Sequence, residues 1–177
     1  MLAGVSATVL ISVVAGYLAI KGGFVPANAD ARPSGVERWA ARTSLNATVA
    51  REMPKEPNPV SLNQQNLLAG MKLYAQNCSI CHGSQSGTPS NIARGFYQRA
   101  PQFAKRGVED DPEGATFWKI SHGIRLTAMP AFVKTLSDEQ RWQITLFLKH
   151  MDALPLSVSN AWKRLGTAAQ KRRTRAG

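Results

Sequence analysis

The sequence contains few residues that could form disulfides or bind soft metals: two cysteines and three histidines among 177 residues. Because Cys78 and Cys81 are the only cysteines, neither can pair with a third thiol elsewhere in the chain. A zinc site would need more cysteine or histidine ligands close by, and a thioredoxin-like redox pair would need a βαβ pattern, which is missing. No internal repeat is present either. The chemistry of the two cysteines must therefore come from their immediate surroundings.

The two cysteines lie in the string Cys78-Ser79-Ile80-Cys81-His82, which has the C-x-x-C-H spacing of a haem c attachment site. Two thiols three positions apart on one helical turn can each add to a vinyl group of the same porphyrin. The histidine that follows then lies beneath the ring with a nitrogen directed at the iron. The motif predicts one covalent haem c, with His82 as an iron ligand, and a single motif excludes a chain of haems within this protein.

The iron of such a haem needs a ligand on its second face, and a thioether is common in electron carriers because it favours ferrous iron. The candidates downstream are His122, Met129, His150 and Met151. We favour Met129, because Pro130 after it fixes a local bend that suits a loop holding one side chain rigidly. His122 fits a helix end, where it would cap carbonyl groups. The last two candidates fit surface and core positions of a periodic helix.

Residues 63–155 resemble a class I monohaem cytochrome c domain of the bacterial, membrane-associated kind. The matching segments, besides the haem motif, are residues 70–77, 97–103, 117–132 and 136–148. The resemblance implies a small all-α fold around the haem, with His82 and Met129 as axial ligands. It also implies that the first and last helices of the domain cross, with Gly70 and Tyr74 against Trp142 and Phe147. Many relatives have glycine where this chain has Ala128, and alanine can adopt the conformation required.

The residues themselves agree with this all-α expectation. Residues 61–77 carry apolar side chains at a helical rather than a strand-like period. Gly70 costs a helix about 1 kcal/mol relative to alanine, which makes sense if another helix approaches closely there. Ser137 and Gln140 form a capping-box pattern at the start of a second helix. Its predicted buried face comprises Trp142, Ile144, Leu146, Phe147 and Leu148.

Two further residues are candidates for contact with the haem. Trp118 could cover the porphyrin and donate its indole N–H to a propionate, or it could simply pack in the core. Arg125 could pair with a propionate, although a solvated arginine is the simpler interpretation.

The N-terminus carries the longest apolar run in the chain. Residues 2–20 contain no charge and would span about 28 Å as a helix, close to the hydrocarbon thickness of a bilayer. A removable signal is one interpretation, because Ala27-Asn28-Ala29 resembles a cleavage site. We favour a retained anchor in contact with membrane lipid, because no basic residue precedes the run and it is longer than most signal cores.

The sequence thus divides into a transmembrane anchor at 1–21, a linker at 22–61, a cytochrome c haem domain at 62–156 and a basic tail at 157–177. Prolines mark the linker, and Ser34 and Glu37 have the form of a capping box for a short helix within it. Such a helix has too little apolar face to fold alone, so it would lie on the haem domain or on a partner.

The tail helps raise the net charge to +11. It could be a solvated tail, or could dock on an acidic redox partner or lipid head groups, whereas nucleic acid does not suit an exported haem protein. Its residues around Trp162 and Leu165 could form a short helix against another subunit.

Together these features predict a membrane-anchored monohaem cytochrome c that transfers single electrons. Haem c attachment implies maturation outside the bacterial cytoplasm, so we expect a single-pass protein of the inner membrane with its haem domain in the periplasm. Such a protein would be a tethered carrier or a subunit of a respiratory or photosynthetic complex, rather than an enzyme by itself. The alternative is a haem sensor or peroxidase-like enzyme with a displaceable distal ligand, in which His122 would act as acid or base.

Overall fold

The computed structural model describes residues 2–175 and the side chains of residues 4–165. Helices and loops make up this part of the chain, which contains no strand, so the predicted all-α class is confirmed. The helices are α1 (Leu2–Lys21), α2 (Gly35–Glu52), α3 (Gln64–Asn77), α4 (Ser79–His82), α5 (Asn91–Arg94), α6 (Glu113–His122), α7 (Asp138–Lys149) and α8 (Leu156–Arg175). They fall into two compact units, Met1–Arg32 and Pro33–Gly177.

The first unit is built around α1, whose side chains from Val5 to Lys21 are mostly apolar and, except for the half-buried Ala19, exposed. Its stretch Gly4–Lys21 is long and apolar enough to cross a membrane, although a signal sequence would meet the same criterion. The helix ends at two glycines, where Gly23 adopts a φ of 71° that favours glycine.

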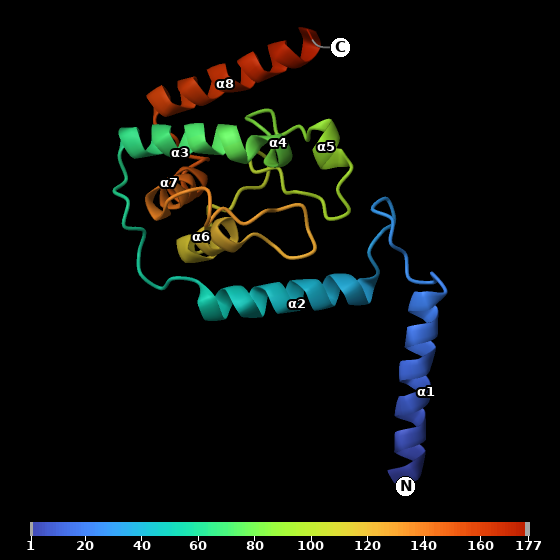
Figure 1. Ribbon diagram of the computed structural model, residues 1–177. Helices are drawn as coiled ribbons and strands as arrows, with labels where there is room; N and C mark the ends of the chain where they lie inside the picture. Colours follow the sequence, from blue (N-terminus) through green and yellow to red (C-terminus); the bar gives the residue numbers. More distant parts are fainter. Residues whose placement is uncertain (1, 176–177) are drawn as a thin grey trace. The chain divides into compact units, whose positions relative to one another are not determined.

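In the second unit, five helices lie in the spatial order α8, α3, α7, α6 and α2, and each contacts the next (Figure 1). The crossing of α3 and α7 forms the centre of the core. A Cβ atom built on Gly70 would lie 2.0 Å from the carbonyl oxygen of Gln143, so only glycine allows this approach. The rings of Tyr74 and Phe147 meet there with their centroids 5.6 Å apart. The close contact predicted at Gly70 is therefore confirmed.

Helix α7 begins as its sequence predicts. The Ser137 side chain accepts a hydrogen bond from the backbone N–H of Gln140, and the Gln140 side chain accepts one from the backbone N–H of Ser137. The whole predicted apolar face of the helix is buried. Trp142 stacks on Phe117 of α6, with ring centroids 4.0 Å apart.

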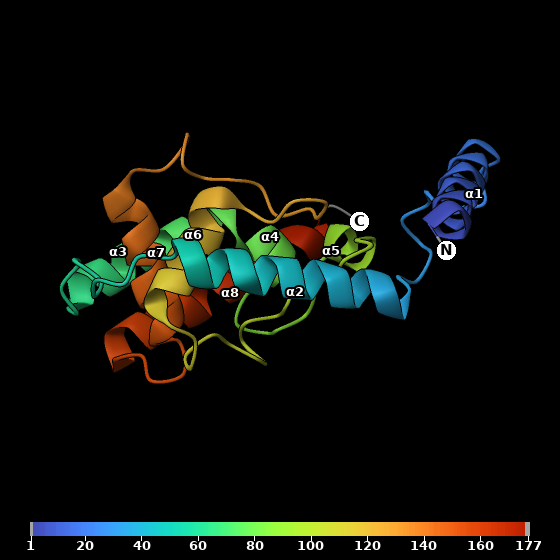
Figure 2. The same ribbon diagram turned by 90° about the horizontal axis from the view of Figure 1, so that it is seen from below.

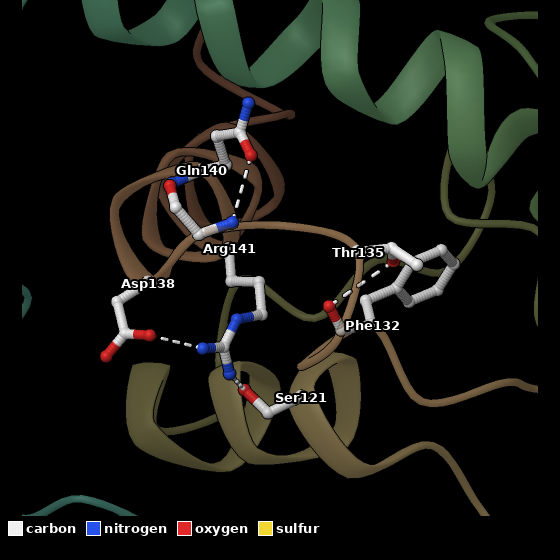
Figure 3. Close-up of polar contacts among 7 residues, drawn as sticks. Ser121, Phe132, Thr135, Asp138, Gln140 and Arg141 are labelled. Atoms are coloured by element: carbon white, nitrogen blue, oxygen red, sulfur yellow. Dashed lines mark hydrogen bonds and ion pairs between the residues drawn. The ribbon is translucent and has the colours of Figure 1, made fainter.

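An arginine also lies inside the contact of α6 with α7. Arg141 is 5% exposed, and its guanidinium donates to the Ser121 hydroxyl and to the Asp138 carboxylate (Figure 3). Its guanidinium carbon also lies 5.0 Å from the centre of the Phe117 ring. Such a buried cation needs several partners, because its removal from water is costly.

Helix α2 is longer than the short helix expected in the linker. Ser34 caps it by accepting a hydrogen bond from the Glu37 N–H, but the second half of the capping box is missing. The Glu37 carboxylate instead accepts a hydrogen bond from the Tyr97 hydroxyl at 2.5 Å. Val49 is buried where α2 contacts α6. Of the two alternatives for this segment, packing on the chain's own domain is therefore the one observed.

Helix α8 begins directly after Pro155 and differs from the expected tail. Val158 and Trp162 lie in the core, where the Trp162 ring meets Tyr74 and Phe147 edge-on at centroid distances of 5.5 and 5.4 Å. Trp162 thus packs against its own chain rather than against another subunit. The two residues are four positions apart, so they share one face of a helix. The strongly basic end, residues 171–177, lies outside the described side chains.

Candidate functional site

The predicted haem motif forms one turn of helix directly after α3. Cys78 lies between α3 and α4, and its carbonyl accepts hydrogen bonds from the backbone N–H groups of Cys81 and His82 at 3.0 and 2.9 Å. Both thiols are free. Burial raises the pKa of the Cys78 thiol to about 12, and burial also raises the pKa of Cys81. Both thiols lie on the same helical turn, as attachment to one porphyrin requires.

One hydrogen bond fixes the tautomer of His82. Its Nδ1 lies 3.0 Å from the carbonyl oxygen of Pro101. Because a carbonyl can only accept, Nδ1 carries the proton and Nε2 keeps its lone pair, as a metal ligand needs. Burial lowers the pKa of the imidazole and so favours the neutral ring. The bond to Pro101 partly opposes this shift. Phe103 stacks on the same ring at a centroid distance of 4.5 Å.

Side chains from other segments hold the backbone of the motif in place. The buried Tyr74 hydroxyl donates to the carbonyl of Gly83 at 2.9 Å. Gln102 donates through Nε2 to the Cys81 carbonyl at 3.0 Å, and the Ser90 hydroxyl donates to the Ile80 carbonyl at 2.5 Å. The sequence gives no sign of these bonds, because each joins residues that are distant along the chain or involves a backbone acceptor.

The turn after the motif requires glycine. Gly83 has a φ of 79°, and a Cβ atom there would lie 2.4 Å from the Gln102 side-chain oxygen. This turn directs the chain into the loop that returns at Pro101 and Gln102.

The loop that carries Met129 is tied to the end of α6. Met129 donates its backbone N–H to Thr127 Oγ1 at 3.1 Å, and its carbonyl accepts from the N–H of Ile124 at 3.2 Å. Gly123, with a φ of 65°, packs so closely on this loop that a Cβ atom would lie 2.6 Å from the Met129 carbonyl oxygen. The half-buried Met129 side chain therefore projects from a fixed backbone. Figure 1 shows this loop (orange) and α4 at the same end of the α3–α7 pair.

The other three candidates for the second iron ligand lie at helix ends or against the core. His122 ends α6, as its sequence predicts, and is exposed. His150 caps the end of α7, and Met151 packs against the core.

The two further candidates for contact with the haem, Trp118 and Arg125, differ in burial. Trp118 lies on α6, and its indole Nε1 is buried without a hydrogen-bond partner among the described residues. The pKa of Glu52 is lowered mainly by a hydrogen bond from Arg51, and to a smaller degree by the nearby indole N–H. The indole N–H and that carboxylate do not reach hydrogen-bond geometry, so the donor remains available. Arg125 is exposed.

These residues fit a covalent haem c. The chain offers two free thiols on one turn, an imidazole whose Nε2 is free, a thioether on a rigid loop and an indole N–H without a partner among the described residues. Among the described residues, no cluster of three or more His, Cys, Asp or Glu side chains could hold a metal ion.

One protein-family model matches the part of the chain that carries this site. Residues 65–148 match the family model described as cytochrome c oxidase, cbb3-type, subunit III. No curated protein sequence matches the chain significantly.

Among solved structures, a chain of the Kuenenia stuttgartiensis reducing HAO-like protein complex is similar. The identity is 25%, the TM-score is 0.44, and the match covers 59% of this chain and 50% of that one. A TM-score this low does not establish a shared fold, and the match spans only about half of that chain's length. Together with the haem motif on one helical turn, the match to the family model identifies residues 65–148 as a c-type cytochrome domain.

Proposed function

We propose that this protein is a membrane-anchored cytochrome that carries one electron at a time at the periplasmic face of a bacterial inner membrane. Cys78 and Cys81 would attach one haem c, and His82 and Met129 would bind its iron. The observation that carries the proposal is the hydrogen bond from His82 Nδ1 to Pro101, because it leaves Nε2 ready to bind a metal.

A bound haem c supplies the reversible one-electron change of its iron. The chain's contribution is to hold both ligands still while the charge changes. The bond to Pro101 fixes the His82 ring, and hydrogen bonds on both sides of Met129 fix the backbone of the second ligand. With both residues held in this way, neither would have to move, so little reorganisation would accompany electron transfer. The thioether also favours the ferrous state.

Helix α1 supports the membrane part of the proposal, since it is apolar all round and long enough to span a bilayer. Tethering to the membrane raises the effective concentration of the cytochrome near membrane-bound redox partners. The matched family is described as an oxidase subunit, which favours a role as an electron-transferring subunit of a larger membrane complex.

Visible spectra of the detergent-purified protein test the proposal: oxidised, reduced, and reduced under carbon monoxide. We expect sharp low-spin bands, the weak far-red band of a methionine–ferric bond and no response to carbon monoxide. Rapid carbon monoxide binding with high-spin features would remove Met129 as a ligand and favour a sensor or a peroxidase-like enzyme. Absence of covalent haem would refute the assignment of Cys78 and Cys81.

A further inference from the structure

Helix α2 has an uncharged face that packs against nothing in its own domain. Its contact with α6 uses Val49, which is buried, and the half-buried Leu45 on the same side of the helix. The opposite side is an uncharged stripe at helical spacing, all exposed: Val36, Trp39, Ala40, Thr43, Ala47 and Ala50. Figure 2, which views the second unit from the α2 side, shows no other element of that unit over this helix.

The beginning of the stripe holds its two large side chains, and both are strongly exposed. Val36 is 74% exposed and Trp39 is 68% exposed. A single exposed apolar residue needs no explanation, but a tryptophan and a valine one turn apart at the start of an uncharged stripe form an apolar patch. Tryptophan is the residue most suited to the boundary between lipid and water, because its ring is apolar and its N–H is polar.

The exposed charges of α2 and its ends are mostly positive, although Arg38 lies on the side of the helix that carries Leu45 and Val49. Arg32, Arg38, Arg42, Arg51 and Lys55 are exposed cations in and beside α2. Both acidic residues of the helix are engaged, Glu37 with the Tyr97 hydroxyl and Glu52 with Arg51. An uncharged stripe on a helix whose exposed charges are mostly cationic complements a bilayer with anionic head groups, whose phosphates long arginine side chains can reach.

The position of α2 in the chain points to the same occupant. Only residues 22–34 separate it from α1, so at about 3.5 Å per residue the start of α2 stays within about 45 Å of the membrane in which α1 would end. The connector itself continues the apolar character, since Phe24 is 82% exposed and Val25 is also exposed.

We infer that the Val36–Ala50 stripe of α2 lies on the surface of the lipid bilayer, as an interfacial helix between the transmembrane segment and the haem domain. This inference rests on the proposed membrane anchoring. Docking of α2 on the bilayer would hold the haem domain in one orientation to the membrane. A freely tethered cytochrome would instead tumble, and its haem would face a membrane-bound partner only part of the time.

Site-directed spin labelling of the full-length holoprotein in vesicles of mixed zwitterionic and anionic lipid tests the inference. Val36→Cys and Ala47→Cys place a nitroxide on the stripe, and Gln65→Cys places one on the exposed start of α3 as a matched control. The thiols of Cys78 and Cys81 would be consumed by the haem, so the introduced thiol is the one labelled. Collision with oxygen, which enters lipid, is compared with collision with a water-soluble nickel chelate.

We expect the ratio of oxygen to nickel accessibility at positions 36 and 47 to exceed the ratio at position 65 several-fold. Labels on the stripe that collide freely with the nickel chelate would overturn the inference, as would labels shielded from both reagents, which would show a second copy of the chain over the stripe. Alkaline carbonate extraction of the same vesicles separates this result from failure of the anchor. If the protein resists extraction and the stripe is in water, the anchor stands and the inference fails.

Discussion

His82 donates a hydrogen bond from Nδ1 to the carbonyl oxygen of Pro101 at 3.0 Å, so the segment before Phe103 determines how the imidazole is held. Gln102 secures that segment by donating to the carbonyls of Ala100 and Cys81 at 3.1 and 3.0 Å. The proposed ligand and the residues that orient it are therefore joined in one small network. An orienting partner of this kind commonly strengthens a histidine ligand.

The first prediction concerns that network. Gln102→Leu removes both hydrogen bonds from partly buried carbonyls, and we expect the free energy of unfolding of the holoprotein to fall by about 1–3 kcal/mol in urea titrations. Gln98→Leu, in the same loop, is the matched control and should change stability little. Equal stability of the two variants would mean that Gln102 does not secure the segment.

The second prediction distinguishes Met129 from the other methionine candidate. Met129→Leu should abolish the far-red methionine–ferric band and allow the reduced protein to bind carbon monoxide. Met151→Leu makes the same chemical change at a core position and should leave both spectra unchanged. Such volume-conserving changes usually cost less than about 1.5 kcal/mol, so both variants should fold. A far-red band that survives in Met129→Leu would rule this ligand out.

The third prediction tests the crossing of α3 with α7. A Cβ atom on Gly70 would lie 2.0 Å from the Gln143 carbonyl oxygen, so Gly70→Ala forces the helices apart. We expect a loss of stability of about 1–3 kcal/mol, measured by thermal or urea unfolding. Gly35→Ala provides the control, because no atom lies within 4 Å of a Cβ built there. If both variants are equally stable, the helices do not cross this closely.

The fourth prediction compares the two partners of Arg141 seen in Figure 3. Ser121 is 1% exposed, so Ser121→Ala leaves a buried cation with one partner fewer and should cost about 1.5–3 kcal/mol. The Asp138 side chain is 83% exposed, so water can replace it, and Asp138→Asn should cost less than about 1 kcal/mol. Urea titrations of the two variants check this order, and the reverse order would contradict it.

The fifth prediction concerns pH and the contact of Tyr97 with α2. The hydrogen bond to the Glu37 carboxylate, with desolvation and negative charge in addition, raises the pKa of the Tyr97 phenol above its ordinary 10.0. The folded protein therefore favours the protonated phenol. The stabilising contribution is fully present below pH 10.0 and is lost as the pH rises through the raised pKa.

NMR of the protein with isotope-labelled tyrosine measures that pKa directly, and Tyr97→Phe identifies the signal. In Glu37→Gln, which removes the carboxylate charge, the pKa of Tyr97 should fall toward 10.0. An unchanged pKa would show that Glu37 does not hold the phenol.

Much of this protein's fold and site could be predicted from short-range features of its sequence. The C-x-x-C-H string, the capping box at Ser137 and the helical spacing of apolar residues each involve positions within a few residues of one another. The same locality explains two wrong expectations. The pattern at Ser34 and Glu37 could not show that Glu37 binds Tyr97. The residues around Trp162 indicated a short helix, but they could not show that Val158 and Trp162 pack in this chain's own core rather than against another subunit.

Only the tertiary structure decided how the site is held. The residue type at position 101 does not reveal that its carbonyl accepts a hydrogen bond from His82. The bonds from Tyr74, Ser90 and Gln102 to the haem motif depend on segments brought together by the α3–α7 crossing. Sequence periodicity places a residue on a face, but it does not say which distant backbone that face will meet. For this reason the sequence predicts the ligand residues, whereas the fold sets the tautomer of His82 and the rigidity of the Met129 loop.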